Sequence, residues 1–370
     1  MDFSGIIKIT DLNDFLNPSE NCSVHNNMIH KSTENTAKVS LSDCLACSGC
    51  VTSAETVLLS QQSVETLHSH LSSNVPITMS LSQQSLISLS NHLSIPLSTL
   101  SRQIAFALRS KGINRVLPMT STRDIILESA YQEFKQRLSN NTLPVLSSEC
   151  PGWLCFALKK GDEKLVPLMS KCKTPMLAQR EIYSVEGFHV AVMPCYDKKL
   201  EGVMDEGVDL VLTTTELLEF CSELSEESEF PEFFSSVVLK SSSLGYAEYV
   251  LNRAVKELYG EDFTPEFRPT RRRDVIEAEY KDLRFCIATG FQNIQNLIRE
   301  IKTGKCRYSY IEIMACPMGC LNGGGQFRSS REEVTRIEAE TSKFFKKSEN
   351  LEVLGNLREL KLLNTNKLKW

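Results

Sequence analysis

The sequence predicts an α/β fold, and three features of the chain of 370 residues support this prediction. From about residue 76, short apolar runs alternate with segments of helical periodicity. The run 208–212 is apolar enough for a parallel strand that is buried on both faces. Three cysteines, Cys150, Cys195 and Cys316, each come directly after a predicted strand. Such strands form sheets with crossover connections, and ligands bind at the carboxyl ends of their strands.

The expected elements follow one another along most of the chain. Strands are expected at 75–79, 113–117, 143–146, 188–193 and 208–212. Helices are expected at 97–108, 121–138, 213–220, 246–259 and 291–301. Ser121 and Asp124 resemble a capping box that opens the second of these helices. The segment 80–101 alternates Ser with Leu and Ile, and the sequence leaves open whether it is a serine-rich surface or a strand and turn.

Composition narrows the functional classes. The hydrophobic content of 41% and charged content of 24% fit a soluble globular protein, and the length favours two or more domains. A net charge of −5 argues against a surface that binds nucleic-acid phosphates, so Arg271–Arg273 are expected to be a solvated patch. No stretch approaches the ~20 apolar residues of a membrane span, and the N-terminus lacks the pattern of a secretory signal. We therefore expect a reducing compartment, where 13 cysteines favour metal or redox chemistry over disulfides.

The first cysteine motif is Cys44-x-x-Cys47-x-x-Cys50. Three thiolates at this spacing suit three corners of an iron–sulfur cube. Structural zinc more often uses two separate Cys-x-x-Cys pairs, so zinc is the weaker alternative. The fourth ligand is expected to be Cys22, with His25 or His30 as alternatives from the same polar segment.

The second motif is Cys316-Pro317-Met318-Gly319-Cys320, which three consecutive glycines follow at 323–325. Glycines in a row weaken regular structure and are expected where a cofactor or tight packing needs close backbone approach. Alone, a pair of cysteines four residues apart is weak evidence for a site. With Cys150 and Cys195 at the ends of other strands, however, four thiolates can converge on one site.

Three sequence motifs resemble those around the active-site cluster of iron-only hydrogenases. They are Ser148-Glu149-Cys150-Pro151-Gly152-Trp153, the stretch from Met193-Pro194-Cys195 through Lys198 to Glu201, and the segment 314–326. Together with Cys22, the segment 43–50 and the terminal Trp370, the chain is more similar to the cytosolic iron–sulfur assembly factors of the iron-only-hydrogenase-like family. The resemblance extends from about residue 3 to residue 326.

The resemblance implies a two-lobed α/β domain with a small ferredoxin-like segment at the N-terminus. The implied domains are a cluster-binding segment at 1–75, a hydrogenase-like domain at 76–330 and a helical segment at 331–370. It also implies two 4Fe–4S clusters. Their ligands are expected to be Cys22, Cys44, Cys47 and Cys50 for the N-terminal cluster, and Cys150, Cys195, Cys316 and Cys320 for a buried one. Cys320 stands where the cysteine of true hydrogenases bridges to a two-iron unit.

For function, the resemblance implies a non-enzymatic protein without catalytic residues that passes clusters from an upstream scaffold to a targeting complex. The recipients would be cytosolic and nuclear apoproteins, reached indirectly. The expected location is the cytoplasm, with the nucleus left open. Proteins of this pathway that end in an aliphatic residue, an acidic residue and Trp resemble ligands of the targeting complex. Lys369 breaks that pattern before Trp370, so the sequence leaves open whether Trp370 docks or is an unimportant end.

Departures from the hydrogenase motifs favour the assembly role over the alternative, a hydrogenase-type redox enzyme. Glu149 replaces the cysteine that relays protons, although a carboxylic acid can also move protons. Met318 replaces a glycine and is expected to crowd the space of a two-iron unit, and Phe327 replaces a proline. Lys198 and Glu201 have two interpretations: a donor to a cluster ligand with a helix-orienting partner, or a surface ion pair at helical spacing.

Overall fold

The computed structural model describes residues 59–160, 164–204, 206–230, 234–235, 245–341 and 346–347. The chain divides into two compact units, residues 1–40 and residues 41–370, and every described residue belongs to the second. The expected ligands of the N-terminal cluster and the terminal Trp370 lie outside the described residues.

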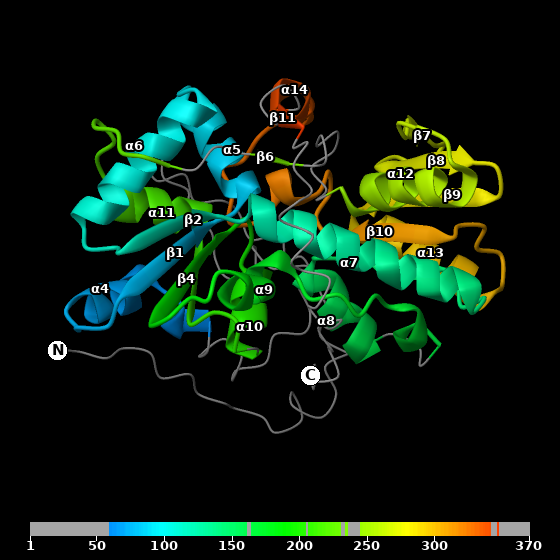
Figure 1. Ribbon diagram of the computed structural model, residues 1–370, viewed down its shortest axis with the longest axis horizontal. Coiled ribbons are helices and arrows are strands. Elements are labelled where there is room, and N and C mark those ends of the chain that lie inside the picture. The colour runs from blue at the N-terminus through cyan, green and yellow to red at the C-terminus, as the bar shows by residue number, and fades with distance from the viewer. Residues whose placement is uncertain are drawn as a thin grey trace, which may run out of the picture. The chain divides into compact units, whose positions relative to one another are not determined.

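The first sheet is parallel and has four strands in the order β2-β1-β4-β5 (Figure 1). Their bounds are β1 Ile77–Leu81, β2 Arg115–Pro118, β4 Phe188–Met193 and β5 Leu210–Thr213. Side chains of β4 alternate between two cores, because successive residues of a strand point to opposite faces. Val190 and Val192 pack in one core with α5 (Gln83–Leu93) and α6 (Leu97–Ser110), whereas Ala191 and Met193 pack in another with α9 (Pro175–Ile182).

The second sheet has five strands in the order β3-β10-β9-β8-β7. Their bounds are β3 Val145–Ser147, β7 Arg268–Pro269, β8 Val275–Tyr280, β9 Leu283–Thr289 and β10 Tyr310–Met314. Strands β3, β10 and β9 are parallel, whereas β8 and β7 run antiparallel to their neighbours. Tyr310 and Met314 of β10 face the helices α7 (Thr120–Ser139) and α12 (Tyr246–Tyr259), and Ile311 and Ile313 face α8 (Pro151–Lys160) and α13 (Phe291–Lys302).

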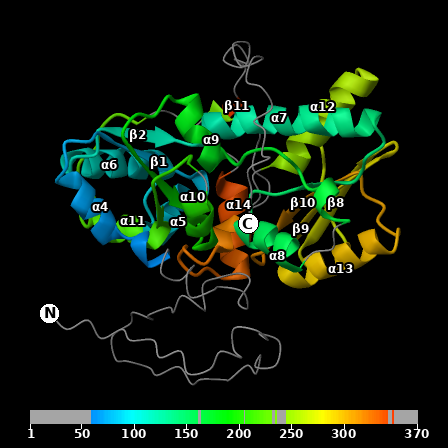
Figure 2. The same cartoon turned by 90° about the horizontal axis from the view of Figure 1, so that it is seen from below.

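The long helix α7 contacts both α9, beside the first sheet, and α12, on the second (Figure 2). The other described elements connect or cover the strands and helices named above. They are α4 Val64–Leu71, η1 Val166–Leu168, α10 Asp197–Met204, α11 Thr214–Cys221, β6 Phe234–Ser235, η2 Cys320–Asn322, α14 Arg331–Thr341 and β11 Lys346–Lys347. The predicted two-lobed α/β class is confirmed for the described part of the chain.

One local prediction was wrong, and one segment differs from both alternatives that the sequence left open. Helix α7 begins at Thr120 without a side-chain cap, whereas the observed capping box joins Thr213 to Glu216 at the start of α11. The serine-rich segment forms α5 and enters α6, and seven successive residues of α5 from Gln83 are buried. Its serines can be buried because they find local partners: Ser85 N donates to Ser82 Oγ, and Ser101 Oγ donates to the Leu97 carbonyl.

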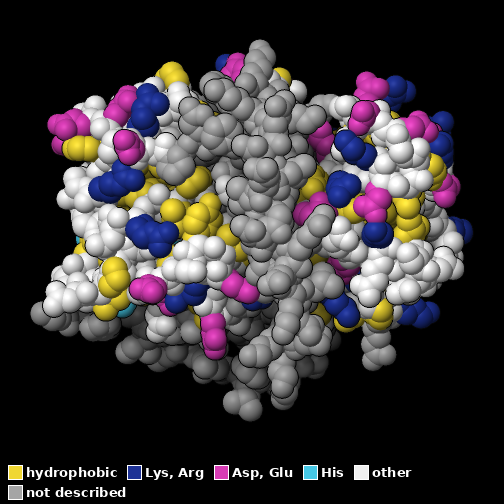
Figure 3. Space-filling view, in the orientation of Figure 1, with side chains coloured by type: hydrophobic (Ala, Val, Ile, Leu, Met, Phe, Trp, Pro, Cys, Tyr) yellow, Lys and Arg dark blue, Asp and Glu magenta, His cyan; other side chains and the backbone are white. Residues whose placement is uncertain are grey.

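Basic and acidic side chains are interspersed over the described surface that Figure 3 shows, which fits the expectation that the arginine run is solvated. Arg272 pairs with Glu300, on a neighbouring helix, rather than standing in a purely basic stripe. Within the described ranges, the structure contains no helix with the length and apolar character needed to cross a bilayer.

Candidate metal centre

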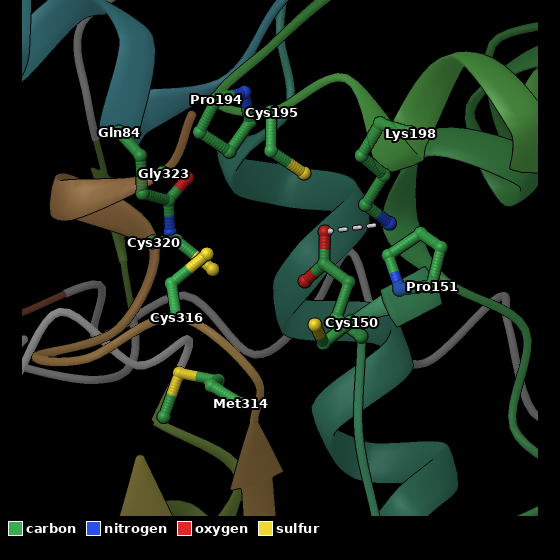
Figure 4. Close-up of a pocket in the computed structure, with 11 residues that line it drawn as sticks. Gln84, Cys150, Pro151, Pro194, Cys195, Lys198, Met314, Cys316, Cys320 and Gly323 are labelled. Atoms are coloured by element: carbon green, nitrogen blue, oxygen red, sulfur yellow. Dashed lines mark ion pairs between the residues drawn. The ribbon is translucent and has the colours of Figure 1, made fainter. Parts of the chain in front are cut away.

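Four cysteines from both sheets line one cavity (Figure 4). Cys195 follows β4 of the first sheet, whereas Cys150 follows β3 and Cys316 and Cys320 follow β10 of the second. The cavity is small, with a volume of about 20 Å³. Its wall is formed by Gln84, Glu149, Cys150, Pro151, Pro194, Cys195, Lys198, Met314, Cys316, Cys320 and Gly323. The predicted positions after strand ends are confirmed, but the strands belong to two sheets rather than to one sheet edge.

Hydrogen bonds fix the turn that carries Cys150. Ser148 Oγ donates to the Ile313 carbonyl at 2.6 Å, which joins this turn to the end of β10. The amide of Cys150 donates to Ser148 Oγ at 3.0 Å, and the amide of Ala315 donates to Cys150 Sγ at 3.4 Å. Hydrogen bonds between protein groups therefore hold together the turns that follow β3 and β10.

The glycine run brings the loop after Cys320 against the Pro194 turn. A Cβ on Gly323 would lie 2.4 Å from the Pro194 carbonyl oxygen, closer than a non-bonded carbon can approach. The amide of Gly325 donates to the same oxygen at 3.0 Å. The glycines were expected to serve either a cofactor or tight packing. These contacts show tight packing between the two cysteine-bearing turns.

Met318 does not line the cavity, and its expected crowding of a two-iron unit stays a prediction. Its backbone has a φ of 63°, and its amide donates to Thr289 Oγ1 at 3.1 Å. The side chain packs against the core beside the first sheet and is not part of the cavity wall. The methionine that does line the cavity is Met314, at the end of β10.

A buried charge network borders the cysteines. Lys198 Nζ lies 2.6 Å from Glu201 Oε2 and 3.6 Å from Glu149 Oε1, and all three side chains are buried. The contact with Glu201 is an ion pair rather than a well-aligned hydrogen bond. Glu201 also accepts from Thr174 Oγ1 at 2.6 Å. The interpretation of Lys198 and Glu201 as a surface ion pair was wrong in one respect. The two residues pair at helical spacing, but their side chains are buried.

Burial sets the protonation of these groups. Loss of solvent raises the pKa of Glu149 to about 7, although Lys198 opposes the shift. For Lys198, burial lowers the pKa, but the carboxylates of Glu201 and Glu149 together outweigh burial and raise it. The ammonium therefore stays charged, and its charge is directed at two carboxylates.

The four thiols are also affected by burial. Burial and the Asp197 carboxylate raise the pKa of Cys150 to about 11, and burial raises the pKa values of Cys195, Cys316 and Cys320 well above 9.0. Without metal these groups are thiols, so metal binding would displace their protons. Cys172, which does not line the cavity, is affected in the same direction, because burial and Glu133 raise its pKa.

The donor set fits an iron–sulfur cube. Among the described residues, no three His, Cys, Asp or Glu side chains meet closely enough to hold a single metal ion. In a cube, each of the four cysteines binds a different iron, so the thiolates surround a volume rather than meet at a point. Cys150, Cys195, Cys316 and Cys320 line one cavity without meeting at a point, which fits this arrangement.

Two further residues of this region carried no recognisable signal in the sequence. Gln84 lines the cavity from the first turn of α5, inside the segment whose structure was left open. Arg123 is buried on α7, where its Nη1 donates to Gln83 Oε1 at 2.7 Å and its charge acts on Glu149. Neither belongs to a cysteine motif, and only the folded chain brings them to the site.

Comparisons with known proteins identify relatives of this chain. The family model of the iron only hydrogenase large subunit, C-terminal domain, matches residues 75–324. Protein NAR1 of Arabidopsis thaliana is 36% identical over 91% of this chain and 87% of its own length. Cytosolic iron-sulfur assembly component 3 of Mus musculus is 34% identical over 90% of this chain and 87% of its own.

Among solved structures, a variant of FeFe-hydrogenase HydA1 from Chlamydomonas reinhardtii matches with a TM-score of 0.67 and 21% identity. The match covers 82% of this chain and 95% of the hydrogenase chain, and at this identity it shows the fold alone. The chain therefore belongs to the family of NAR1 and cytosolic iron–sulfur assembly component 3, whose fold is that of the iron-only hydrogenase large subunit.

Proposed function

We propose that this protein is a non-enzymatic component of cytosolic iron–sulfur protein assembly that binds two 4Fe–4S clusters. The observation that carries the proposal is the convergence of Cys150, Cys195, Cys316 and Cys320 on one buried cavity. The relatives named as cytosolic iron–sulfur assembly proteins support the pathway, because their similarity covers about nine tenths of this chain.

In the proposed buried centre, each of the four cysteines holds one iron. When bound, a 4Fe–4S cluster supplies one-electron redox chemistry whose potential the surroundings adjust. Pro151, Pro194 and Met314 make part of the wall around the cysteines apolar. Because the ligands come from both sheets, a cluster here would join the two halves of the domain as structural metals do.

The second cluster is proposed at Cys22, Cys44, Cys47 and Cys50, which lie outside the described residues. We infer that this cluster is the one exchanged with partner proteins, whereas the buried one stays in place. The proposed route leads from an upstream scaffold to a targeting complex, and Trp370 is the proposed point of contact with that complex. The proposed location is the cytoplasm, where the names of the relatives place their pathway.

The charge network supports an assembly role over hydrogen chemistry. Lys198 is engaged by Glu149 and Glu201, so its charge is already compensated by protein groups. A hydrogenase-type redox enzyme is the second candidate, because the fold is shared with hydrogenases and Glu149, with a pKa of about 7, lines the cavity. Hydrogen evolution that depends on Cys320 in anaerobically purified protein would favour this candidate.

Metal analysis of the full chain tests the proposal. Iron and acid-labile sulfide are expected in equal amounts. Cys150→Ala and Cys44→Ala are each expected to lose roughly half of the iron and sulfide, because each variant lacks one ligand of a different cluster. Electron paramagnetic resonance (EPR) of the reduced protein is expected to lose a different signal in each variant. Protein that holds zinc and no sulfide would contradict the proposal.

Delivery is tested separately, with an apoprotein that gains activity when it receives a cluster. Cys44→Ala is expected to abolish delivery, because it removes the cluster proposed to exchange. Removal of Trp370 is expected to weaken delivery while the iron content stays the same. Undiminished delivery by Cys44→Ala would contradict the exchange role of the N-terminal cluster.

A further inference from the structure

A buried amide without a partner faces the cysteine cavity from the first turn of α5. Gln84 is 5% exposed and lines the cavity, and its Nε2 has no hydrogen-bond partner among the described residues. In Figure 4 its side chain extends toward Cys316 and Cys320. A buried donor that lacks an acceptor destabilises the folded protein, so such a group indicates an acceptor that the polypeptide alone does not supply.

The position of Gln84 is fixed by its neighbours. The amide of Ser82 donates to the Val192 carbonyl at 3.1 Å, which joins the start of α5 to the strand that leads to Cys195. The adjacent Gln83 is engaged by Arg123, and α5 packs against η2, which begins at Cys320. Gln84 is therefore held between the two cysteine-bearing turns and cannot turn to solvent without moving the helix.

The surroundings identify the kind of acceptor. On the side of Gln84, the cavity wall presents the sulfur atoms of Cys316 and Cys320. Glu149 also lines the cavity, where its Oε1 lies 3.6 Å from Lys198 Nζ and its Oε2 has no hydrogen-bond partner among the described residues. The first turn of a helix carries a partial positive charge, and its amides have no acceptor within the helix. A donor at this place is suited to a negatively charged sulfur.

We propose that Gln84 donates a hydrogen bond to a sulfur of the buried cluster, on the side of Cys316 and Cys320, and thereby raises the reduction potential of that cluster. The inference rests on the proposed function, in which a 4Fe–4S cluster fills the cavity. Reduction adds negative charge to the cluster, and a hydrogen bond to sulfur stabilises the more negative state. Two donors on the wall, Gln84 Nε2 and Lys198 Nζ, have no hydrogen-bond partner among the described residues, but Lys198 has ion-pair contacts with two carboxylates whereas Gln84 has none.

The test is an EPR-monitored redox titration of the full chain loaded anaerobically, with Gln84→Leu and Gln84→Met. Both side chains are of similar size to glutamine and lack the donor. At the midpoint potential of the unchanged protein, the ratio of reduced to oxidised buried cluster is expected to fall about tenfold, which corresponds to 59 mV for one electron. The signal that Cys150→Ala abolishes identifies the buried cluster.

Gln103→Leu is the matched control, because it makes the same chemical change on α6, outside the cavity wall. Its potential is expected to equal that of the unchanged protein. Electron–nuclear double resonance gives a second readout: one of the exchangeable protons coupled to the buried cluster in the unchanged protein and in Gln103→Leu is expected to disappear in Gln84→Met, whereas others, such as the Ala315 amide proton, remain. A purely structural role for Gln84 would not remove this coupling.

The outcomes distinguish a failure of the proposed role of Gln84 from a failure of the proposed function. Loaded Gln84→Leu and Gln84→Met with unaltered potential and proton coupling would overturn the role of Gln84 and leave the cluster proposal intact. If one variant fails to load, the other decides, and loss of the cluster from both also counts against a tuning role. Absence of any signal that depends on Cys150 in the unchanged protein would overturn the proposed function itself.

Discussion

Gly323 lies so close to Pro194 that a Cβ at the glycine would fall 2.4 Å from the proline carbonyl oxygen. This contact joins the loop after Cys320, from the second sheet, to the turn that carries Cys195, from the first. The distance between these cysteines depends on a residue without a side chain. The glycine therefore determines how closely the two halves of the site approach.

Replacement of Gly323 by alanine is expected to separate the two turns. Its φ of −64° suits alanine, so the cost comes from the clash with Pro194. We expect a loss of about 1–3 kcal/mol in the free energy of unfolding and a lower content of bound iron. Chemical denaturation and metal analysis measure these changes.

Gly260→Ala is the control for this prediction. Gly260 has a φ of +69° and open space around the position of a Cβ, so alanine strains the end of α12 without a clash. We expect lower stability with unchanged iron content. Equal iron in Gly323→Ala and the unchanged protein would show that the contact does not shape the site.

Loss of Lys198 is expected to leave two carboxylates buried without their common counterion. For Lys198→Met we expect a decrease of about 3–5 kcal/mol in the free energy of unfolding, because Glu149 and Glu201 are both buried. The double variant Lys198→Met with Glu201→Gln is expected to recover part of this loss. Urea denaturation of the single and double variants measures the coupling, and strictly additive losses would contradict it.

Stability is expected to fall in mildly acidic solution because of His189. Its imidazole is buried: Nε2 lies 2.9 Å from Ser80 Oγ, and Nδ1 lies 2.9 Å from the Gly207 carbonyl oxygen. Burial lowers the pKa of His189 below the ordinary histidine value of 6.5. Below pH 6.5 the unfolded chain binds a proton that the folded chain does not, so the free energy of unfolding decreases as the pH falls.

The expected slope from this group is at most about 1.4 kcal/mol per pH unit, with the full stability present above pH 6.5. Urea titrations between pH 8 and pH 5 measure this slope. His189→Gln removes the titrating group and is expected to flatten the profile in this range. A variant whose slope equals that of the unchanged protein would assign the acid sensitivity to other groups.

Among the described cysteines, replacement is expected to lower the iron content only where the cysteine lines the cavity. Cys150→Ala is expected to lose the buried cluster, because it removes one of four ligands. Cys286 is fully buried in β9 within the apolar core and does not line the cavity. Cys286→Ala is expected to cost about 1 kcal/mol of stability with full iron content. Metal analysis of both variants tests this difference, and iron loss from Cys286→Ala would contradict it.

Local patterns were sufficient for several elements. Strand β4 and helix α12 have the predicted bounds, 188–193 and 246–259, because continuous apolar residues or a clear helical period mark each of them. In α5 the alternation of Ser with Leu gave no clear period. That segment is a helix because its residues are buried against the first sheet, where serines bond to one another and to the backbone.

The sequence alone determined that Cys150, Cys195 and Cys316 follow strand ends, because strand ends depend on local hydrophobic runs and turn residues. Only the tertiary structure decided that these strands belong to two sheets, that Lys198 and Glu201 are buried, that Met318 packs away from the cavity and that Gln84 faces it. The physical reason is range: periodicity reports the neighbours of a residue along the chain, whereas burial and the pairing of strands depend on contacts between residues that are far apart in sequence.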